Sequence, residues 1–166
     1  MANASGSFVQ SGSYYLNKAS GSANIGANGS EFWNITINGG ATYTAQDDIT
    51  LDGSFTLTSG VFDGNGNTIN LGNGGSDVVT IDGTYKVGAG GVLGIGNGTS
   101  LTVSSTGKIE VVGDGTGIAK VSNNDSGGSY SFTVEGEIAA EYYLFENMSS
   151  VGIYLTTSST IDATYH

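Results

Sequence analysis

The chain has 166 residues, 37% of them hydrophobic, so it is long and apolar enough for one domain with a sizeable core. The formal net charge is −11, from 15 acidic residues against four lysines and no arginine. Binding to phosphates needs clustered cations, so we expect no nucleic acid and no anionic membrane surface as partner. No apolar run is long enough to span a membrane, so we expect no membrane insertion.

Glycine is abundant, with 29 residues, while proline and cysteine are absent. Gly, Asn, Ser, Thr and Asp fill the gaps between apolar pairs, which is typical of many short strands joined by turns. Residues 1–31 are weakly patterned, and we expect an irregular coil there that caps the N-terminal end. Residues 32–166 are predicted to form the coils of one domain. The first residues lack the basic region and apolar core of a signal peptide, so we expect an excised fragment of a longer protein.

Residues 32–40 are the first clear strand, in which Ile35 and Ile37 point to one side and the polar residues to the other. A related alternation recurs at residues 49–53 (ITLDG), 79–83 (VTIDG) and 109–113 (IEVVG), with spacings of 79 − 49 = 30 and 109 − 79 = 30. A fixed period of this length indicates stacked repeats.

Two further strand families run beside this one, which gives three strands per repeat. The sequence therefore predicts an all-β fold: a right-handed parallel β-helix, or β-solenoid, with three-sided coils of about 30 residues. In that arrangement Leu51, Ile81 and Val111 are predicted to stack on one another in the core.

After Gly113 the register is predicted to slip, with a turn-rich excursion over residues 116–129. The next inner strand is expected at residues 142–145, and the last strand at residues 159–163. No cap is recognisable after that strand, and an uncapped coil exposes unpaired N–H and C=O groups. We therefore expect self-association, for example end-to-end stacking into a fibre, or contact with neighbouring domains of the same protein.

Two stretches, residues 32–39 (FWNITING) and 48–63 (DITLDGSFTLTSGVFD), resemble the repeats of large secreted bacterial surface proteins. These are haemagglutinin-like and adhesin-like β-helical proteins, including cargo of the type nine secretion system. The segment 130–136 (YSFTVEG) is similar to a later part of such proteins, and the resemblance covers roughly residues 32–163. It implies a β-helical fold and an extracellular, cell-surface setting.

Calcium is the metal that the sequence suggests. Asp63, Asn65 and Asn67 place oxygen ligands at alternate positions, as calcium loops do, and Asp77 lies in a stretch that approaches a calcium-binding β-roll repeat. The alternative is ordinary turn chemistry, because Asp-Gly-Asn-Gly is also a common turn sequence.

No catalytic or cofactor-binding residue is predicted. Asp52 and Asp82 occupy equivalent positions in two repeats, so they are predicted to be neighbours on adjacent coils, the spacing that a glycosidase pair would need. Stacked like charges are unfavourable, however, and each Asp also fits the close of a turn before a glycine. The lysines are scattered, and the single histidine is His166.

Two exposed features suggest ligands. Eight threonines are expected to face outward: Thr36, Thr50, Thr56, Thr58, Thr68, Thr80, Thr102 and Thr133. An ice-binding face would need them in unbroken rows, and Glu110, Lys86 and Asn70 are predicted to interrupt those rows. Tyrosines and Trp33 can stack on sugars, or can plug the ends of the core.

The first functional hypothesis is a non-catalytic structural or adhesive module of an extracellular bacterial surface protein. A carbohydrate-binding or polysaccharide-degrading β-helix, which would contact surface glycans, is the first alternative. An ice-binding β-solenoid is the second.

Overall fold

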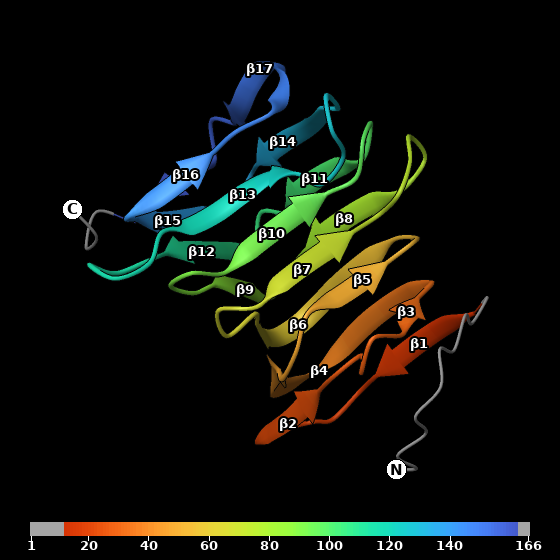
Figure 1. The fold of residues 1–166 in the computed structure, drawn as a ribbon. Coiled ribbons are helices and arrows are strands. Elements are labelled where there is room, and N and C mark those ends of the chain that lie inside the picture. Colours follow the sequence, from red (N-terminus) through yellow and green to blue (C-terminus); the bar gives the residue numbers. More distant parts are fainter. Residues whose placement is uncertain (1–11, 163–166) are drawn as a thin grey trace.

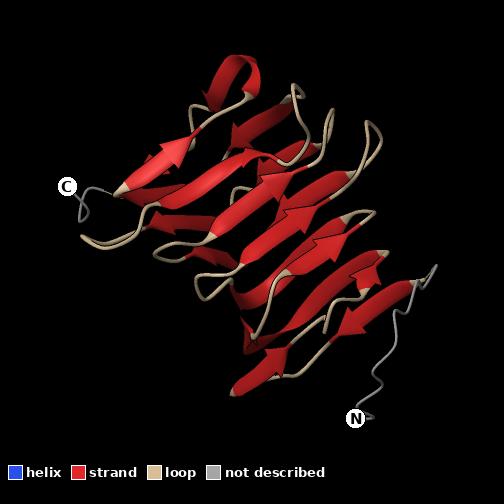
Figure 2. Ribbon diagram, in the orientation of Figure 1, coloured by secondary structure: helices blue, strands red, loops and turns tan. Residues whose placement is uncertain are grey.

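The structure is a computed structural model that describes residues 12–162, and within that range it contains β-strands and turns but no helix (Figures 1 and 2). Every strand pairing in it is parallel. The strands stack as a β-solenoid of about 6 turns. The predicted all-β parallel solenoid is therefore confirmed, while its right-handed winding stays a prediction.

Three columns of stacked strands make up the coils, and we name them faces A, B and C. Face A contains the first part of two long strands, β4 and β6, together with five shorter ones (Figure 1). Its strands, in stacking order, are β1 (Ser13–Leu16), β4 (Asn34–Ala45), β6 (Phe55–Asp63), β8 (Val78–Ile81), β11 (Ser100–Val103), β14 (Tyr130–Val134) and β17 (Met148–Leu155).

Face B continues the same sheet around a corner, because β4 and β6 bend and contribute their second parts to it. Its other strands are β2 (Ser22–Ile25), β9 (Thr84–Val87), β12 (Lys108–Val112), β15 (Glu137–Glu141) and β18 (Thr160–Ile161). Together faces A and B form a 12-stranded sheet.

Face C is a separate, 6-stranded sheet. Its strands are β3 (Glu31–Phe32), β5 (Ile49–Leu51), β7 (Thr68–Leu71), β10 (Val92–Ile95), β13 (Ala119–Asn123) and β16 (Tyr143–Phe145). Figure 1 shows them side by side along the length of the molecule.

The predicted coil length is wrong, because most coils are shorter than the spacing of the sequence repeats. Ile35 pairs with Phe55 (55 − 35 = 20), and Phe55 pairs with Val79 (79 − 55 = 24). One coil approaches the predicted length: it spans 31 residues from Leu101 to Phe132 on face A (132 − 101 = 31) and 29 residues from Ile109 to Ile138 on face B (138 − 109 = 29). That coil is longer because each of its three connections is longer than the matching connection of the coil before it.

The three repeats that suggested the period lie on three different faces. Ile49 is in β5 on face C, Val79 is in β8 on face A, and Ile109 is in β12 on face B. The spacing between these repeats therefore advances the chain by one whole coil and one further side.

The predicted column of Leu51, Ile81 and Val111 is wrong for the same reason. Leu51 pairs with Leu71, Ile81 with Leu57 and Val103, and Val111 with Val87 and Ala140. All three side chains are nevertheless buried, because alternation along each strand is enough to direct them inward.

The inward side chains of the three faces meet in one apolar core that runs through the coils. Three aromatic rings, Phe55, Phe62 and Tyr85, pack together within it, with centroids 5.2–5.9 Å apart. The hydroxyl of Tyr85 is buried there and has no hydrogen-bond partner. Burial therefore raises the pKa of Tyr85, and the negative charge of Asp63 raises it further.

A glycine makes the bend between faces A and B possible within β6. Gly60 has a φ of 80°, and a Cβ at this position would collide with the carbonyl oxygens of Gly39 and Ala41. Only glycine combines this backbone conformation with so close an approach of the neighbouring coil.

Both ends of the predicted domain extend the solenoid as far as the structure describes them. Strands β1 and β2 pair with β4, and β3 pairs with β5, so residues 13–32 form the first coil. Residues 1–11 of the predicted N-terminal cap, and residues 163–166, lie outside the described residues. The inner strand predicted at residues 142–145 corresponds to β16, and the predicted last strand to β18.

Candidate functional site

A row of threonines runs straight along the outside of face A. In the parallel register Thr36 pairs with Thr56, Thr56 with Thr80, Thr80 with Thr102, and Thr102 with Thr133. These five residues come from five successive coils, and we call them the threonine ladder. Tyr15 pairs with the first of them and Tyr154 with the last.

The side chains of the threonine ladder are half-buried, because each packs against its neighbours above and below. In the part of the chain that the structure describes, none of the five hydroxyls is hydrogen-bonded to another protein group. Each is therefore available to a ligand or to water. A β-branched side chain has few χ1 rotamers, so the row is also stiff.

Short side chains flank the ladder on the next outward row of face A. In stacking order this row holds Ser13, Asn34, Ser54, Val78, Ser100 and Ser131. The Ser131 hydroxyl donates to the Ser100 hydroxyl at 3.1 Å, and the Ser54 amide donates to Asn34 Oδ1 at 2.7 Å. None of these six side chains is charged, and none is long enough to cover the threonines.

The predicted interruption of the threonine rows is wrong for face A. Lys86 and Glu110 lie in β9 and β12 on face B, and Asn70 lies in β7 on face C. Of the other predicted outward threonines, Thr50 and Thr68 are on face C, and Thr58 lies at the bend of β6. Sequence reasoning with a constant period missed the ladder because its steps along the chain are unequal: 56 − 36 = 20, 80 − 56 = 24, 102 − 80 = 22 and 133 − 102 = 31.

Face B carries a network of charges in the equivalent outward rows. Lys108 Nζ lies 2.7 Å from Glu137 Oε1, 3.2 Å from Glu110 Oε1 and 3.2 Å from Asp162 Oδ2. Lys86 Nζ lies 2.9 Å from Glu110 Oε2 and extends the network to the next coil. The hydrogen bond to Glu137, with smaller contributions from Asp162 and Glu110, raises the pKa of Lys108 above its ordinary value.

Three of the four calcium candidates lie at one turn, between β6 and β7, where their side chains form hydrogen bonds with backbone groups. Asp63 Oδ1 accepts a hydrogen bond from the amide of Asn65 at 2.8 Å, which is an Asx turn. The side-chain amides of Asn65 and Asn67 both donate to the carbonyl oxygen of Ala45, each at 3.2 Å. These contacts tie the turn to the preceding coil.

Asp77 lies in a different turn, between β7 and β8, so the structure does not bring it to the other three candidates. Its Oδ2 accepts from the amide of Asn73 at 3.1 Å. Among the described residues, no three Asp, Glu, His or Cys side chains lie close enough together to hold a metal ion. Calcium binding stays a prediction.

The predicted pairing of Asp52 with Asp82 is wrong. Asp52 lies at the corner between β5 and β6, where face C meets face A, and its amide donates to Phe32 O. Asp82 lies at the corner between β8 and β9, where face A meets face B, and its amide donates to Leu57 O. The reason is again the coil length, because positions with the spacing of the sequence repeats are not in register.

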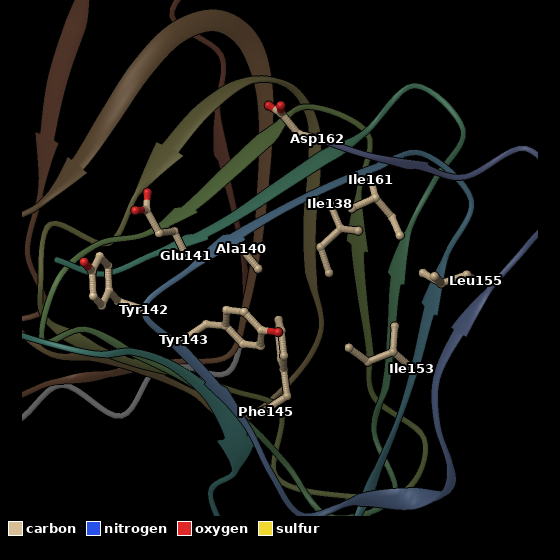
Figure 3. A pocket seen from close by; sticks show the side chains of 10 residues that line it. All are labelled: Ile138, Ala140, Glu141, Tyr142, Tyr143, Phe145, Ile153, Leu155, Ile161 and Asp162. Atoms are coloured by element: carbon tan, nitrogen blue, oxygen red, sulfur yellow. The ribbon is translucent and has the colours of Figure 1, made fainter. Parts of the chain in front are cut away.

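An apolar cavity of about 660 Å³ lies at the C-terminal end of the described solenoid (Figure 3). Its walls are inward-facing side chains of the last two coils, with Glu141 and Asp162 among the lining residues: Ile138, Ala140, Glu141, Tyr142, Tyr143, Phe145, Ile153, Leu155, Ile161 and Asp162. Ile153 continues the inward row of Phe132, and Ile161 continues that of Ile138. The cavity is thus the unfilled continuation of the core.

The aromatic candidates for sugar stacking are divided between the two ends of the described solenoid. Tyr14 packs edge-on against Phe32 in the first coil, with ring centroids 5.2 Å apart. Tyr143 packs against Phe145 beside the cavity, with centroids 5.1 Å apart. The tyrosines and Trp33 therefore do not form one continuous platform.

Comparison of the chain with protein-family models, with curated proteins and with solved structures finds no match. The resemblance to secreted bacterial surface proteins therefore rests on the sequence motifs alone. In the described residues, the structure has no helix of the length and apolarity needed to cross a membrane.

Proposed function

We propose that this chain is a non-catalytic structural and adhesive module of an extracellular bacterial surface protein, and that face A is its adhesive surface. The observation that carries the proposal is the threonine ladder, an unbroken row of stiff, uncharged hydroxyl side chains over five coils. A repeated surface of this kind suits a repeated ligand, because the same contact recurs at every coil.

The core supports the structural half of the proposal. Buried side chains run through the coils without interruption, and each coil is hydrogen-bonded to the next along all three faces. Such a solenoid is a stiff rod that holds a ligand-binding face at a fixed spacing. The bacterial and extracellular setting is supported by the sequence resemblance.

The C-terminal cavity supports a proposed contact with a further coil, either in a neighbouring domain or in a second copy of the chain. Several of the large apolar side chains that line it are exposed, among them Ile161 at 65% and Leu155 at 41%. A patch of this kind marks an interaction surface. Light scattering over a range of concentrations tests for the second copy, and a constant monomer mass would leave the neighbouring domain as the proposed partner.

Adsorption of the purified chain to particulate cellulose, particulate chitin and mucin-coated beads tests the adhesive proposal. We expect adsorption that is lost when Thr80→Lys and Thr102→Lys are combined, because two long charged side chains then stand in the middle of the ladder. The matched control is Thr50→Lys, which adds the same side chain on face C beside Glu31.

Adsorption that is equal in all variants would contradict the assignment of face A, and adsorption that is absent from the wild type on every surface would contradict the adhesive role. Incubation with acidic and neutral polysaccharides tests the non-catalytic part of the proposal. Release of reducing ends or unsaturated products by the wild type would contradict it.

A further inference from the structure

We propose that the ligand of face A is the ordered water lattice of an ice surface, bound through the threonine ladder. This inference rests on the proposed function only in taking face A as the binding surface, and it names the chemical class of the ligand. Its central observation is that Thr36, Thr56, Thr80, Thr102 and Thr133 lie in direct register on adjacent strands.

The spacing of the ladder is set by the backbone. Neighbouring parallel strands lie about 4.8 Å apart, so the five hydroxyls repeat at this distance along the solenoid. Along each strand, outward positions two residues apart are separated by about 6.6 Å, which sets the distance from the threonine ladder to the flanking row of Ser, Asn and Val side chains. The outer surface of face A is therefore a two-dimensional grid of short side chains, and in the flanking row only Val78 lacks a hydrogen-bonding group. Its repeat along the solenoid is close to the shortest lattice repeat of oxygen atoms in hexagonal ice.

Threonine combines the two groups that a water lattice needs. Its hydroxyl donates one hydrogen bond and accepts two, and no protein group within the described residues competes for the ladder's hydroxyls. Its methyl group orders adjacent water without binding it, because an apolar surface restricts the orientations of neighbouring water molecules. The half-buried, β-branched side chains lose little rotamer freedom when the lattice forms on them.

Charge is sparser on face A than on face B, because its acidic residues next to the ladder are Asp82 and Glu135, two residues after Thr80 and Thr133 at the corner with face B. The ion pairs of Lys86, Lys108 and Glu110 lie on face B, where charged groups would orient nearby water in directions that do not match a lattice. On face C the row that begins Thr50, Asn70 continues with Gly94 and Ser122, so it has no uniform side chain. Within the described solenoid, a uniform row of this length is found on face A alone.

Neither the C-terminal cavity nor the turn between β6 and β7 points to so definite a ligand. The C-terminal cavity continues the core, and its occupant is already proposed to be a further coil. The turn of Asp63, Asn65 and Asn67 is occupied by hydrogen bonds to the backbone.

Thermal hysteresis and inhibition of ice recrystallisation by the purified chain test the inference. We expect the wild type and the Thr50→Lys control to show both activities. We expect the combined Thr80→Lys and Thr102→Lys variant to lose them. Circular dichroism and thermal melting of all three proteins show that any loss does not come from unfolding. A second variant, Thr80→Val, keeps the methyl groups and the strand propensity, and we expect a partial loss.

The inference is overturned if the wild type shows neither activity, or if the face A variant retains both. The adsorption measurements on cellulose, chitin and mucin separate this failure from a failure of the proposed function. Adsorption to a polysaccharide that depends on face A, without any effect on ice, would leave the adhesive proposal standing and would assign the face to glycans instead.

Discussion

Faces A and B share a backbone but differ in the side chains that they present to solvent. Both are columns of parallel strands, both run the length of the described solenoid, and β4 and β6 contribute to each of them. Their inward rows are equally apolar and buried. Outside, face A presents the threonine ladder, whereas face B presents the ion network around Lys108.

The difference shows that the inner and outer rows of this fold are under separate requirements. Stacking needs apolar, preferably β-branched residues at alternate positions, and it places no demand on the residues between them. The outer row can then serve stability, as we expect on face B, or binding, as we propose for face A. Substitutions on each face, and at the bend between them, test this division.

The largest effect is expected at the bend that joins the two faces. Replacing Gly60 by Ala places a Cβ against the carbonyl oxygens of Gly39 and Ala41, in a backbone conformation that L-residues rarely adopt. We expect the free energy of unfolding to fall by about 3 kcal/mol, as measured by urea denaturation.

The matched control is Gly74→Ala, because a Cβ at Gly74 meets no atom within 4 Å and its φ is not positive. We expect this control to change the stability by less than about 0.5 kcal/mol. Equal effects of the two substitutions would contradict the proposed role of Gly60.

Removing the central cation of face B is expected to have the next largest effect. In Lys108→Met the carboxylates of Glu110 and Glu137 lose the cation between them, while the long apolar stem is retained. We expect a loss of about 1–2 kcal/mol, because the three carboxylates share this one ammonium group and it is only 24% exposed. The loss should shrink in high salt, which screens the charges.

The same pair of proteins provides a pH test. The carboxylates hold the pKa of Lys108 above its ordinary value of 10.5 in the native state. The group therefore contributes its full stabilisation below the unfolded-state pKa. It loses this contribution as the pH rises through the native-state pKa, because the unfolded chain releases its proton first. We expect the stability difference between wild type and Lys108→Met to be smaller at about pH 11 than at about pH 9. A difference that grows over this range would contradict the network.

Much of this comparison could be predicted from the sequence, but the register could not. Alternation correctly directed Ile35 and Ile37 into the core and the threonines outward, because the two-residue period of a strand is local. The pairing of coils depends on the lengths of the connections, which vary from coil to coil. A constant spacing that joins three different faces therefore looked like a coil length.

Whether a candidate site could be predicted depended on whether its residues lie in one turn or in several coils. The turn geometry of Asp63 could be anticipated from Asp-Gly-Asn-Gly, since an Asx turn involves only neighbouring residues. The threonine ladder and the Lys108 network join residues from several coils, so they required the strand pairings. For Asp52 and Asp82 the error is the reverse, because a pair was predicted that does not exist. The true coil length places the two residues at different corners.

A substitution in the core that faces A and B share, at Tyr85, is expected to increase the stability of the protein. Tyr85, from face B, packs against Phe55, from face A, and its buried hydroxyl has no hydrogen-bond partner. Replacing Tyr85 by Phe removes this unsatisfied group and keeps the ring, so we expect stabilisation of about 1 kcal/mol in urea denaturation. The control is Tyr130→Phe, where the hydroxyl donates to Val121 O at 3.3 Å and its loss should not stabilise. Destabilisation by Tyr85→Phe would mean that its hydroxyl has a partner in solution.

The smallest effect on the free energy of unfolding is expected for a substitution in the threonine ladder. A small effect would show that the fold does not depend on the hydroxyl. Valine has the shape of threonine and an equal or better preference for strands, and the hydroxyl of Thr80 bonds to no described protein group. We therefore expect Thr80→Val to change the free energy of unfolding by less than about 0.5 kcal/mol. If the fold does not need the Thr80 hydroxyl, stability does not explain why a threonine recurs in five successive coils. A contact with a ligand outside the protein would then explain it. If the substitution instead costs more than about 1 kcal/mol, the row stabilises the solenoid as the ions of face B do, and the functional contrast between the two faces is lost.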